Sequence, residues 1–175
     1  MRRFYLVFCL VCALVTIGCS NTETETAAEK PFELSDLEAL PTGLVVTHSP
    51  NPVKAKKGGG SGYGYTWQYE TTVESQSGPV AIEHFGSLAD SSGNWVLINF
   101  TKKLFGPKEF EEWYSCAEAT IQQGSSASDP TNWGGNNCLQ HSKIRWFFVG
   151  KDEAGKRVKG EAIVEQLAQV MEESE

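Results

Sequence analysis

The stretch "GYTWQYETTVES", residues 64–75, alternates between two kinds of side chain. One face of an extended chain would carry Tyr65, Trp67, Tyr69, Thr71 and Val73, and the other Thr66, Gln68, Glu70, Thr72 and Glu74. A period of two with one largely apolar face is typical of a β-strand that has one face in solvent. The stretch therefore predicts a sheet, and the neighbouring segments decide what kind of sheet it is.

Two further apolar runs follow, separated by turn-forming residues. "PVAIEHFGSL" (79–88) alternates as a second strand, and "WVLINFT" (95–101) is apolar on both faces, which predicts a strand inside the sheet. The segments between them, 76–78 and 89–94, are rich in Ser, Gly, Asn and Asp, as turns are. Short turns between three strands favour an antiparallel meander.

The second half of the chain predicts helices as well as strands. Pro107 suits the first position of a helix and Gly124 its end, and residues 108–123 place Phe110, Trp113 and Ile121 on one face. "KIRWFFVG" (143–150) predicts a two-faced strand, followed by a short return strand near residues 157–160. Residues 161–173 then predict a closing helix, although a strand running to residue 164 fits the alternation almost as well.

This order of elements predicts an α+β fold: an antiparallel sheet of about five strands with two packed helices, in one domain spanning residues 42–175. An immunoglobulin-like β-sandwich is the first alternative, because residues 143–164 can form a terminal hairpin. The second alternative is a degenerate thioredoxin-like domain, which "WVLINFTKKLFGPKEF" (95–110) and residues 144–170 resemble. Phe105-Gly106-Pro107-Lys108 stands where that family has its active-site cysteines, so the resemblance implies no redox activity.

The chain begins with Met1-Arg2-Arg3 and an apolar run over residues 4–18. Positive charges followed by a short apolar run form a secretory signal, and the run is shorter than the ~20 residues of a membrane-spanning helix. Gly18-Cys19 at its end resembles the lipobox of bacterial lipoproteins, although Thr16 departs from the usual aliphatic residue.

The lipoprotein resemblance implies how the protein is anchored and where. Residues 1–18 would be a signal peptide, and Cys19 would carry diacylglycerol on its thiol and an acyl group such as palmitate on its amine. Residues 19–41, rich in Thr, Glu and Ala at the start, would form a lipidated tether. Ser20 would favour sorting to the outer membrane of a Gram-negative cell, facing the periplasm.

Five cysteines then separate into three groups. Cys9 and Cys12 would leave with the signal peptide and Cys19 would be lipidated, so Cys116 and Cys138 remain as a pair. An oxidising compartment favours a disulfide between them, worth about 3 kcal/mol in the chain-entropy model. Two reduced thiols, or a metal site at Cys138 and His141, are the alternatives.

Charge and motifs restrict the function. Loss of Arg2 and Arg3 would change the formal net charge from −7 to −9, which argues against nucleic acid as a partner. No motif for catalysis, for a resident metal or for a cofactor occurs in the sequence. We therefore expect a non-catalytic binding or scaffolding domain, anchored to the membrane by its lipid and facing an envelope protein or a glycan.

Two sets of residues are candidate sites. The loop over residues 125–137 has no periodicity and combines a Trp with polar residues, as sugar- and protein-binding surfaces do. Its candidate binding residues are Asp129, Asn132, Trp133 and Asn136. The alternative function is an envelope enzyme or a redox or metal-binding protein with a site near His84, Cys138 and His141.

Overall fold

The computed structural model describes residues 30–58 and 62–172. The chain divides into two units, Met1–Phe32 and Glu33–Glu175, and the description below concerns the second. The predicted signal peptide, the predicted lipidation site at Cys19 and the start of the predicted tether lie outside the described residues. The predicted domain start at residue 42 falls inside the second unit, which also contains a short 3-10 helix, η1 (Leu34–Ala39).

The fold is β-rich, and the predicted α+β architecture with two packed helices is wrong. Over the described residues the strands are β1 (Leu44–Ser49), β2 (Val53–Lys57), β3 (Tyr65–Gln68), β4 (Glu70–Ser75), β5 (Val80–Ser91), β6 (Asn94–Leu97), β7 (Thr120–Ile121), β8 (Ser126–Asp129), β9 (Trp133–Asn136), β10 (Ser142–Asp152) and β11 (Arg157–Val170). The helices there are η1, α1 (Pro107–Tyr114) and the 3-10 turn η2 (Ala117–Ala119).

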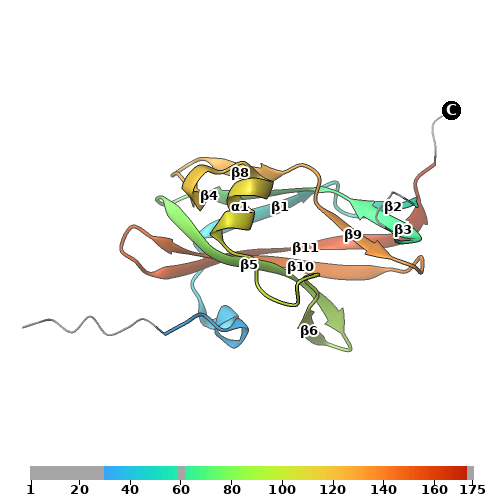
Figure 1. Ribbon diagram of the computed structural model, residues 1–175, viewed down its shortest axis with the longest axis horizontal. Helices are drawn as coiled ribbons and strands as arrows, with labels where there is room; N and C mark the ends of the chain where they lie inside the picture. Colours follow the sequence, from blue (N-terminus) through green and yellow to red (C-terminus); the bar gives the residue numbers. More distant parts are fainter. Residues whose placement is uncertain (1–29, 59–61, 173–175) are drawn as a thin grey trace, which may run out of the picture. The chain divides into compact units, whose positions relative to one another are not determined.

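The strands form two sheets (Figure 1). A curled eight-stranded sheet has the order β6-β5-β10-β11-β2-β3-β9, with β7 paired to β5, and a three-stranded sheet has the order β1-β4-β8. β11 and β2 are parallel, whereas the other paired strands of both sheets are antiparallel. The hairpin predicted for residues 143–164 is present as β10–β11, but the curled sheet matches neither alternative fold.

The stretch that alternates in the sequence is one arm of a long bent ribbon. β3 pairs with β9 in the large sheet, and β4 pairs with β8 in the small sheet. Gln68 lies opposite Trp133 and Thr71 lies opposite Asp129. Between these two pairs, residues 69–70 on one arm therefore face residues 130–132 on the other. An extra residue of this kind is a β-bulge, which bends a strand and redirects its side chains. The ribbon thus passes from one sheet to the other at the bulge.

The segment predicted as the closing helix is instead the second half of β11. Its residues have good helix propensity, but β10 is apolar on both faces and needs a paired neighbour on each side. β5 and β11 supply these neighbours, and Val164 and Gln166 are buried at alternate positions of β11. Sheet pairing therefore overrides local propensity in this segment.

Two other predicted elements are shorter than expected. The helix that starts at Pro107 ends at Tyr114, because Ser115 adopts a left-handed conformation with φ of 51°, and the chain continues into η2 and β7. Residues 95–101 do not form an interior strand: β6 is at the edge of the large sheet, and Val96 and Ile98 remain about half exposed.

The core is built around an aromatic cluster between β5, β10 and α1. Phe85 of β5 stacks on Phe148 of β10 with ring planes 5° apart and meets Phe110 and Tyr114 of α1 edge to face. All four side chains are almost completely buried. Aromatic pairs of this kind each contribute about 0.5–1.5 kcal/mol beyond the burial of their area.

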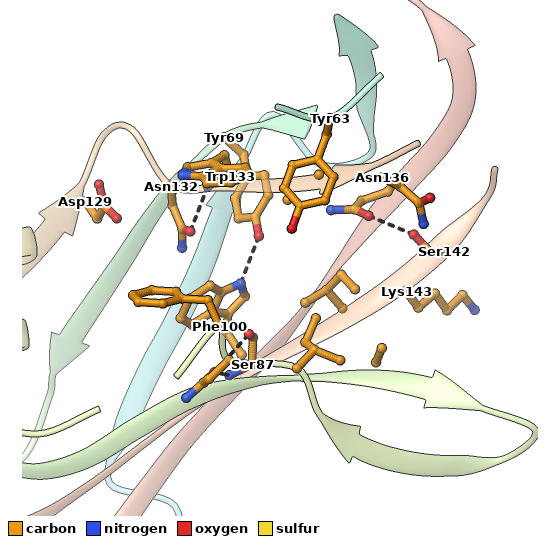
Figure 2. A pocket seen from close by; sticks show the side chains of 18 of the residues that line it. Tyr63, Tyr69, Ser87, Phe100, Asp129, Asn132, Trp133, Asn136, Ser142 and Lys143 are labelled. Atoms are coloured by element: carbon orange, nitrogen blue, oxygen red, sulfur yellow. Dashed lines mark hydrogen bonds between the residues drawn. The ribbon is translucent and has the colours of Figure 1, made fainter. Parts of the chain in front are cut away.

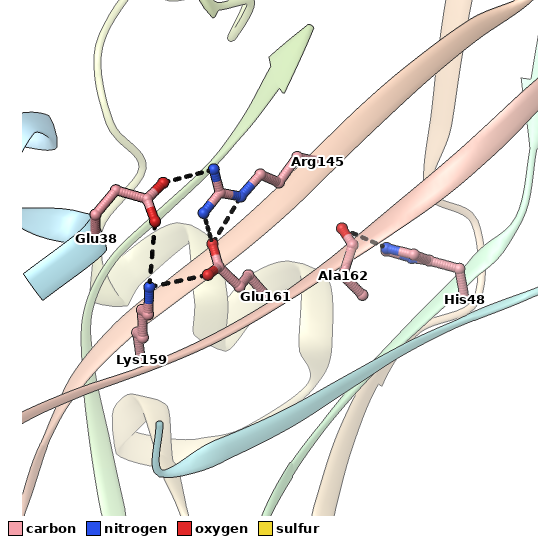
Figure 3. A network of polar contacts seen from close by, with 6 residues as sticks. All are labelled: Glu38, His48, Arg145, Lys159, Glu161 and Ala162. Carbon is pink, nitrogen blue, oxygen red and sulfur yellow. Dashed lines mark hydrogen bonds and ion pairs between the residues drawn. The ribbon is translucent and has the colours of Figure 1, made fainter. Parts of the chain in front are cut away.

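A network of ion pairs holds η1 against the β10–β11 hairpin (Figure 3). Arg145 donates to Glu38 of η1 at 2.8 Å and to Glu161 of β11 at 2.7 Å, and Lys159 pairs with Glu161 at 2.9 Å. Leu37 of η1 is 2% exposed, so this part of the predicted tether packs on the domain. None of the helices within the described ranges has the length and hydrophobicity of a membrane span.

Candidate functional site

A cleft of about 980 Å³ opens where the curled sheet brings β9 toward β5 and β10 (Figure 2). Such a volume is at the upper end of the ~300–1,000 Å³ range of small-molecule sites. The four residues of the predicted binding loop, Asp129, Asn132, Trp133 and Asn136, all line this cleft. The structure therefore brings the whole predicted loop set to one concave surface.

The bulge in the ribbon explains how these side chains reach the cleft. Asp129 Oδ1 accepts hydrogen bonds from the backbone N–H of Thr131 (3.0 Å) and from its hydroxyl (3.2 Å), which closes a local turn. Asn132 Oδ1 accepts from the N–H of Trp133 at 2.8 Å. Pro130 between them has no N–H to offer to the ladder, so the strand is interrupted at this point.

A buried chain of hydrogen bonds supports Asn132 from behind. Asn132 Nδ2 donates to Thr71 Oγ1 at 2.8 Å, and Thr71 Oγ1 also lies 3.0 Å from His48 Nδ1. His48 Nε2 lies 3.4 Å from the carbonyl oxygen of Ala162 (Figure 3), so one tautomer satisfies the chain: Nε2–H donates to Ala162 and Nδ1 accepts from Thr71. Burial lowers the pKa of His48 despite the hydrogen bond to Ala162, which favours this neutral form.

Exposed aromatic side chains form the walls of the cleft. Trp133 and Tyr63 are 48% and 43% exposed, with ring centroids 6.0 Å apart, whereas Phe100 is 79% exposed. Figure 2 shows Trp133 and Tyr63 on one side of the cleft and Phe100 on the opposite side. In contrast, Trp67 and Tyr69 of the alternating stretch are buried. The aromatic face of that stretch therefore belongs mainly to the core.

The floor of the cleft is polar but tightly packed. Trp146 Nε1 donates to the hydroxyl of Tyr69 at 2.9 Å. Ser142 Oγ donates to Gln166 Oε1 at 2.7 Å, while the amide nitrogen of Gln166 has no hydrogen-bond acceptor among the described residues. Gly134 of β9 covers this nitrogen, and a Cβ at that position would lie 2.3 Å from it. The floor of the cleft therefore contains a buried donor, the Gln166 amide nitrogen, whose hydrogen bonds are not made within the described part of the chain.

The wall formed by the loop after β6 is held by Asn99. Its Oδ1 accepts from the backbone N–H of Ser87 at 2.9 Å, and its Nδ2 donates to the carbonyl of Lys103 at 2.8 Å. Asn99 is 4% exposed, so this side chain fixes the loop rather than facing a ligand. Phe100 follows it directly and is thereby held at the cleft mouth.

The alternative site near His84, Cys138 and His141 is not assembled. His84 pairs with Val149 on β10, seven residues from Ser142, and seven residues span about 23 Å along a strand. His141 precedes Ser142, lines the cleft and lies 2.8 Å from Glu165. Within the described residues, no group of three or more His, Cys, Asp or Glu side chains is placed to hold a metal ion.

The predicted disulfide partners are both free thiols in the structure. Cys116 leads through η2 to Thr120, which pairs with Ala81 near one end of β10, whereas Cys138 leads into the other end at Ser142. Cys116 packs against the core and Cys138 is exposed. The topology thus directs the two cysteines toward opposite ends of β10, and the structure does not contain the predicted bond.

The sequence did not predict several cleft residues. Phe100, Ser142 and Gln166 come from three separate segments that only the curling of the sheet brings together. The sequence signal that could have indicated Phe100 is an aromatic residue beside a turn. Burial raises the pKa of Asp129 even though two hydrogen bonds from Thr131 oppose the shift.

Comparison of the chain with models of known protein families, with curated proteins and with solved structures finds no match.

Proposed function

We propose that this protein is a lipid-anchored lipoprotein of the bacterial cell envelope whose β-rich domain binds another envelope component in the cleft, without catalysing a reaction. Cys19 is the attachment point, and the residues that follow it are the tether. In a Gram-negative cell the domain faces the periplasm from the outer membrane. An acidic protein of this kind has an envelope protein or a glycan as its partner rather than nucleic acid.

One observation carries the binding part of the proposal. The cleft combines half-exposed aromatic side chains, Trp133 and Tyr63, with polar groups that converge from several strands. Ligand sites are concave, carry exposed apolar surface and use a few placed polar groups for orientation. Large exposed aromatic residues gathered in one concavity are costly in water unless something covers them.

The alternative of an enzyme or a redox or metal protein has less support. It depends on His84, Cys138 and His141 sharing one site, and along β10 His84 is about 23 Å from Ser142, the residue after His141. A pairing of Cys138 with His141 alone leaves too few ligands for an ordinary transition-metal site.

The anchor is tested by replacing the proposed lipidated cysteine. We expect Cys19→Ala to move the protein from the membrane pellet to the supernatant and to prevent incorporation of labelled palmitate. Cys138→Ser, which changes an exposed thiol in the folded domain, is the matched control and should stay in the pellet. Unchanged sedimentation of Cys19→Ala would contradict the lipid anchor.

The absence of catalysis is tested on the purified intact protein. Chromogenic esters, glycosides and phosphates and a thiol–disulfide exchange assay cover the reaction types of the alternative. We expect no turnover above that of a Trp133→Ala variant. Turnover that this variant loses would show that the cleft is an active site and would overturn the non-catalytic proposal.

A further inference from the structure

We propose that the ligand of the cleft is a neutral oligosaccharide. This inference rests on the proposed function, because it assumes that the cleft is a binding site and names the class of its ligand. Four features of the cleft carry it: the aromatic walls, the polar groups between them, the sign of the charge and the size.

The aromatic walls present ring faces suited to sugars. The ring planes of Trp133 and Tyr63 are 54° apart, with centroids separated by 6.0 Å. Phe100 lies on the opposite side of the cleft (Figure 2), and its ring centroid is 6.3 Å from that of Trp113. A pyranose ring has faces of C–H groups that pack on the electron-rich faces of aromatic rings. Aromatic rings on both sides allow the two faces of a sugar chain to be covered at once.

The polar groups between the walls suit hydroxyl groups, which both donate and accept hydrogen bonds. Amide side chains contribute to this set: Asn136, Gln140 and Gln166 line the cleft, whereas Asn132 is already bonded to Thr71 and Trp133. The Gln166 amide nitrogen is a buried donor without a partner: the residue is 4% exposed, and the nitrogen has no hydrogen-bond acceptor among the described residues. Gly134 packs over this nitrogen, so a ligand hydroxyl would supply the acceptor only where β9 moves aside.

The charge of the cleft disfavours anionic ligands. The carboxylates of Asp90, Glu112 and Asp129 line it, whereas Lys143 is the one lysine or arginine among its lining residues. One oxygen of Asp129 is taken by Thr131, and the other can accept from a sugar hydroxyl. Phosphates and acidic sugars would add negative charge beside these groups, so a neutral chain is the better fit.

The cleft also suits a sugar chain better than an extended peptide. A peptide that adds to a sheet is recognised mainly through main-chain hydrogen bonds along a strand edge. Here the polar lining groups are side-chain amides, hydroxyls and carboxylates from separate segments, namely Asp90 of β5, Glu112 of α1, Asp129 of β8, Asn136 of β9 and Ser142 of β10. The volume of about 980 Å³ is large for a single sugar and has room for several linked ones.

The test uses the intact protein in detergent and a defined panel of probes. The neutral probes are short cello-, chito-, malto-, manno- and xylo-oligosaccharides; oligogalacturonides are the acidic probes, and a library of extended peptides is the third class. Binding is measured on an array and then by calorimetry for each retained probe. Tryptophan fluorescence reports whether the cleft is occupied.

We expect a neutral oligosaccharide to be retained and its affinity to fall roughly tenfold or more in Trp133→Ala. Trp133→Phe keeps an aromatic face and should recover most of the affinity, which separates lost stacking from misfolding. Val96→Ala removes exposed apolar surface on β6 outside the cleft and should change nothing.

Other outcomes overturn the inference in distinguishable ways. Retention of peptides alone, lost in Trp133→Ala, would overturn the saccharide inference and leave cleft binding intact. Retention of acidic probes alone would overturn the charge argument in the same way. Hydrolysis of a bound saccharide would overturn the non-catalytic function, and no retention of any neutral saccharide would overturn the inference itself.

Discussion

Replacing Asn132 by Ala should destabilise the protein and loosen the cleft together. The change removes the donation from Nδ2 to Thr71 at 2.8 Å and the acceptance by Oδ1 from the Trp133 N–H at 2.8 Å. Each bond is worth about 1 kcal/mol net, and a buried group left without its partner costs about 1–3 kcal/mol more. Asn132 is 6% exposed, but Thr71 keeps its contact with His48. We therefore expect the free energy of unfolding to fall by about 2–3 kcal/mol.

Urea unfolding followed by far-UV circular dichroism measures this change, with the slope of the transition expected to stay the same. Asn136→Ala is the matched control: its Oδ1 accepts from the Cys138 N–H at 3.0 Å in an exposed turn, so the loss should stay below about 1 kcal/mol. Equal, small losses in both variants would refute the argument that Asn132 is the buried support of the bulge.

Three further predictions test other parts of the structure. Gly160→Ala should destabilise by about 1–3 kcal/mol in the same unfolding assay, because its Cβ would lie 2.6 Å from Leu44 Cβ and 2.8 Å from Leu44 O, whereas Gly78→Ala has open space and should be neutral. Thermal unfolding should show stability falling as the pH drops below about 6.5, because burial lowers the pKa of His48 and the unfolded chain then binds more protons than the folded one. His48→Asn should weaken this dependence but not abolish it, since burial also lowers the pKa of His84; an unchanged dependence would contradict the assignment. Alkylation should modify Cys138 faster than Cys116, whose pKa is raised by burial and by Glu111, and protection of both until reduction would show a disulfide instead.

The sequence pattern identified some elements and missed others for physical reasons. Alternation over residues 64–75 predicted the buried positions of Trp67, Tyr69 and Val73 because one side of that segment faces the core in both sheets. It could not predict that the segment divides between two sheets, since the bulge that bends it is on the other arm of the ribbon. The pattern of residues 161–173 predicted a helix and fitted a strand almost as well only as far as residue 164, and the pairing with β10 favours the strand.

In the candidate site, too, the residues that are close together in the sequence could be predicted, and those that are far apart could not. Asp129, Asn132, Trp133 and Asn136 lie within eight consecutive residues, so composition alone could indicate a surface loop. Their partners Phe100 and Gln166 are distant in the sequence, and only the curling of the large sheet places them at the same cleft. The short strands β8 and β9 within the predicted loop were missed because four residues each are too few to establish a period.

The central claim is that the cleft between β9, β10 and the loop after β6 binds a neutral oligosaccharide. The most direct measurement is nuclear magnetic resonance of the intact, isotopically labelled protein during titration with the neutral oligosaccharide panel. Trp133 and Trp113 line the cleft, whereas Trp95 lies outside it against Arg145. The account predicts that the indole signals of Trp133 and Trp113 shift together in a saturable way while that of Trp95 stays in place. Absence of any shift, or a shift confined to Trp95, would contradict it.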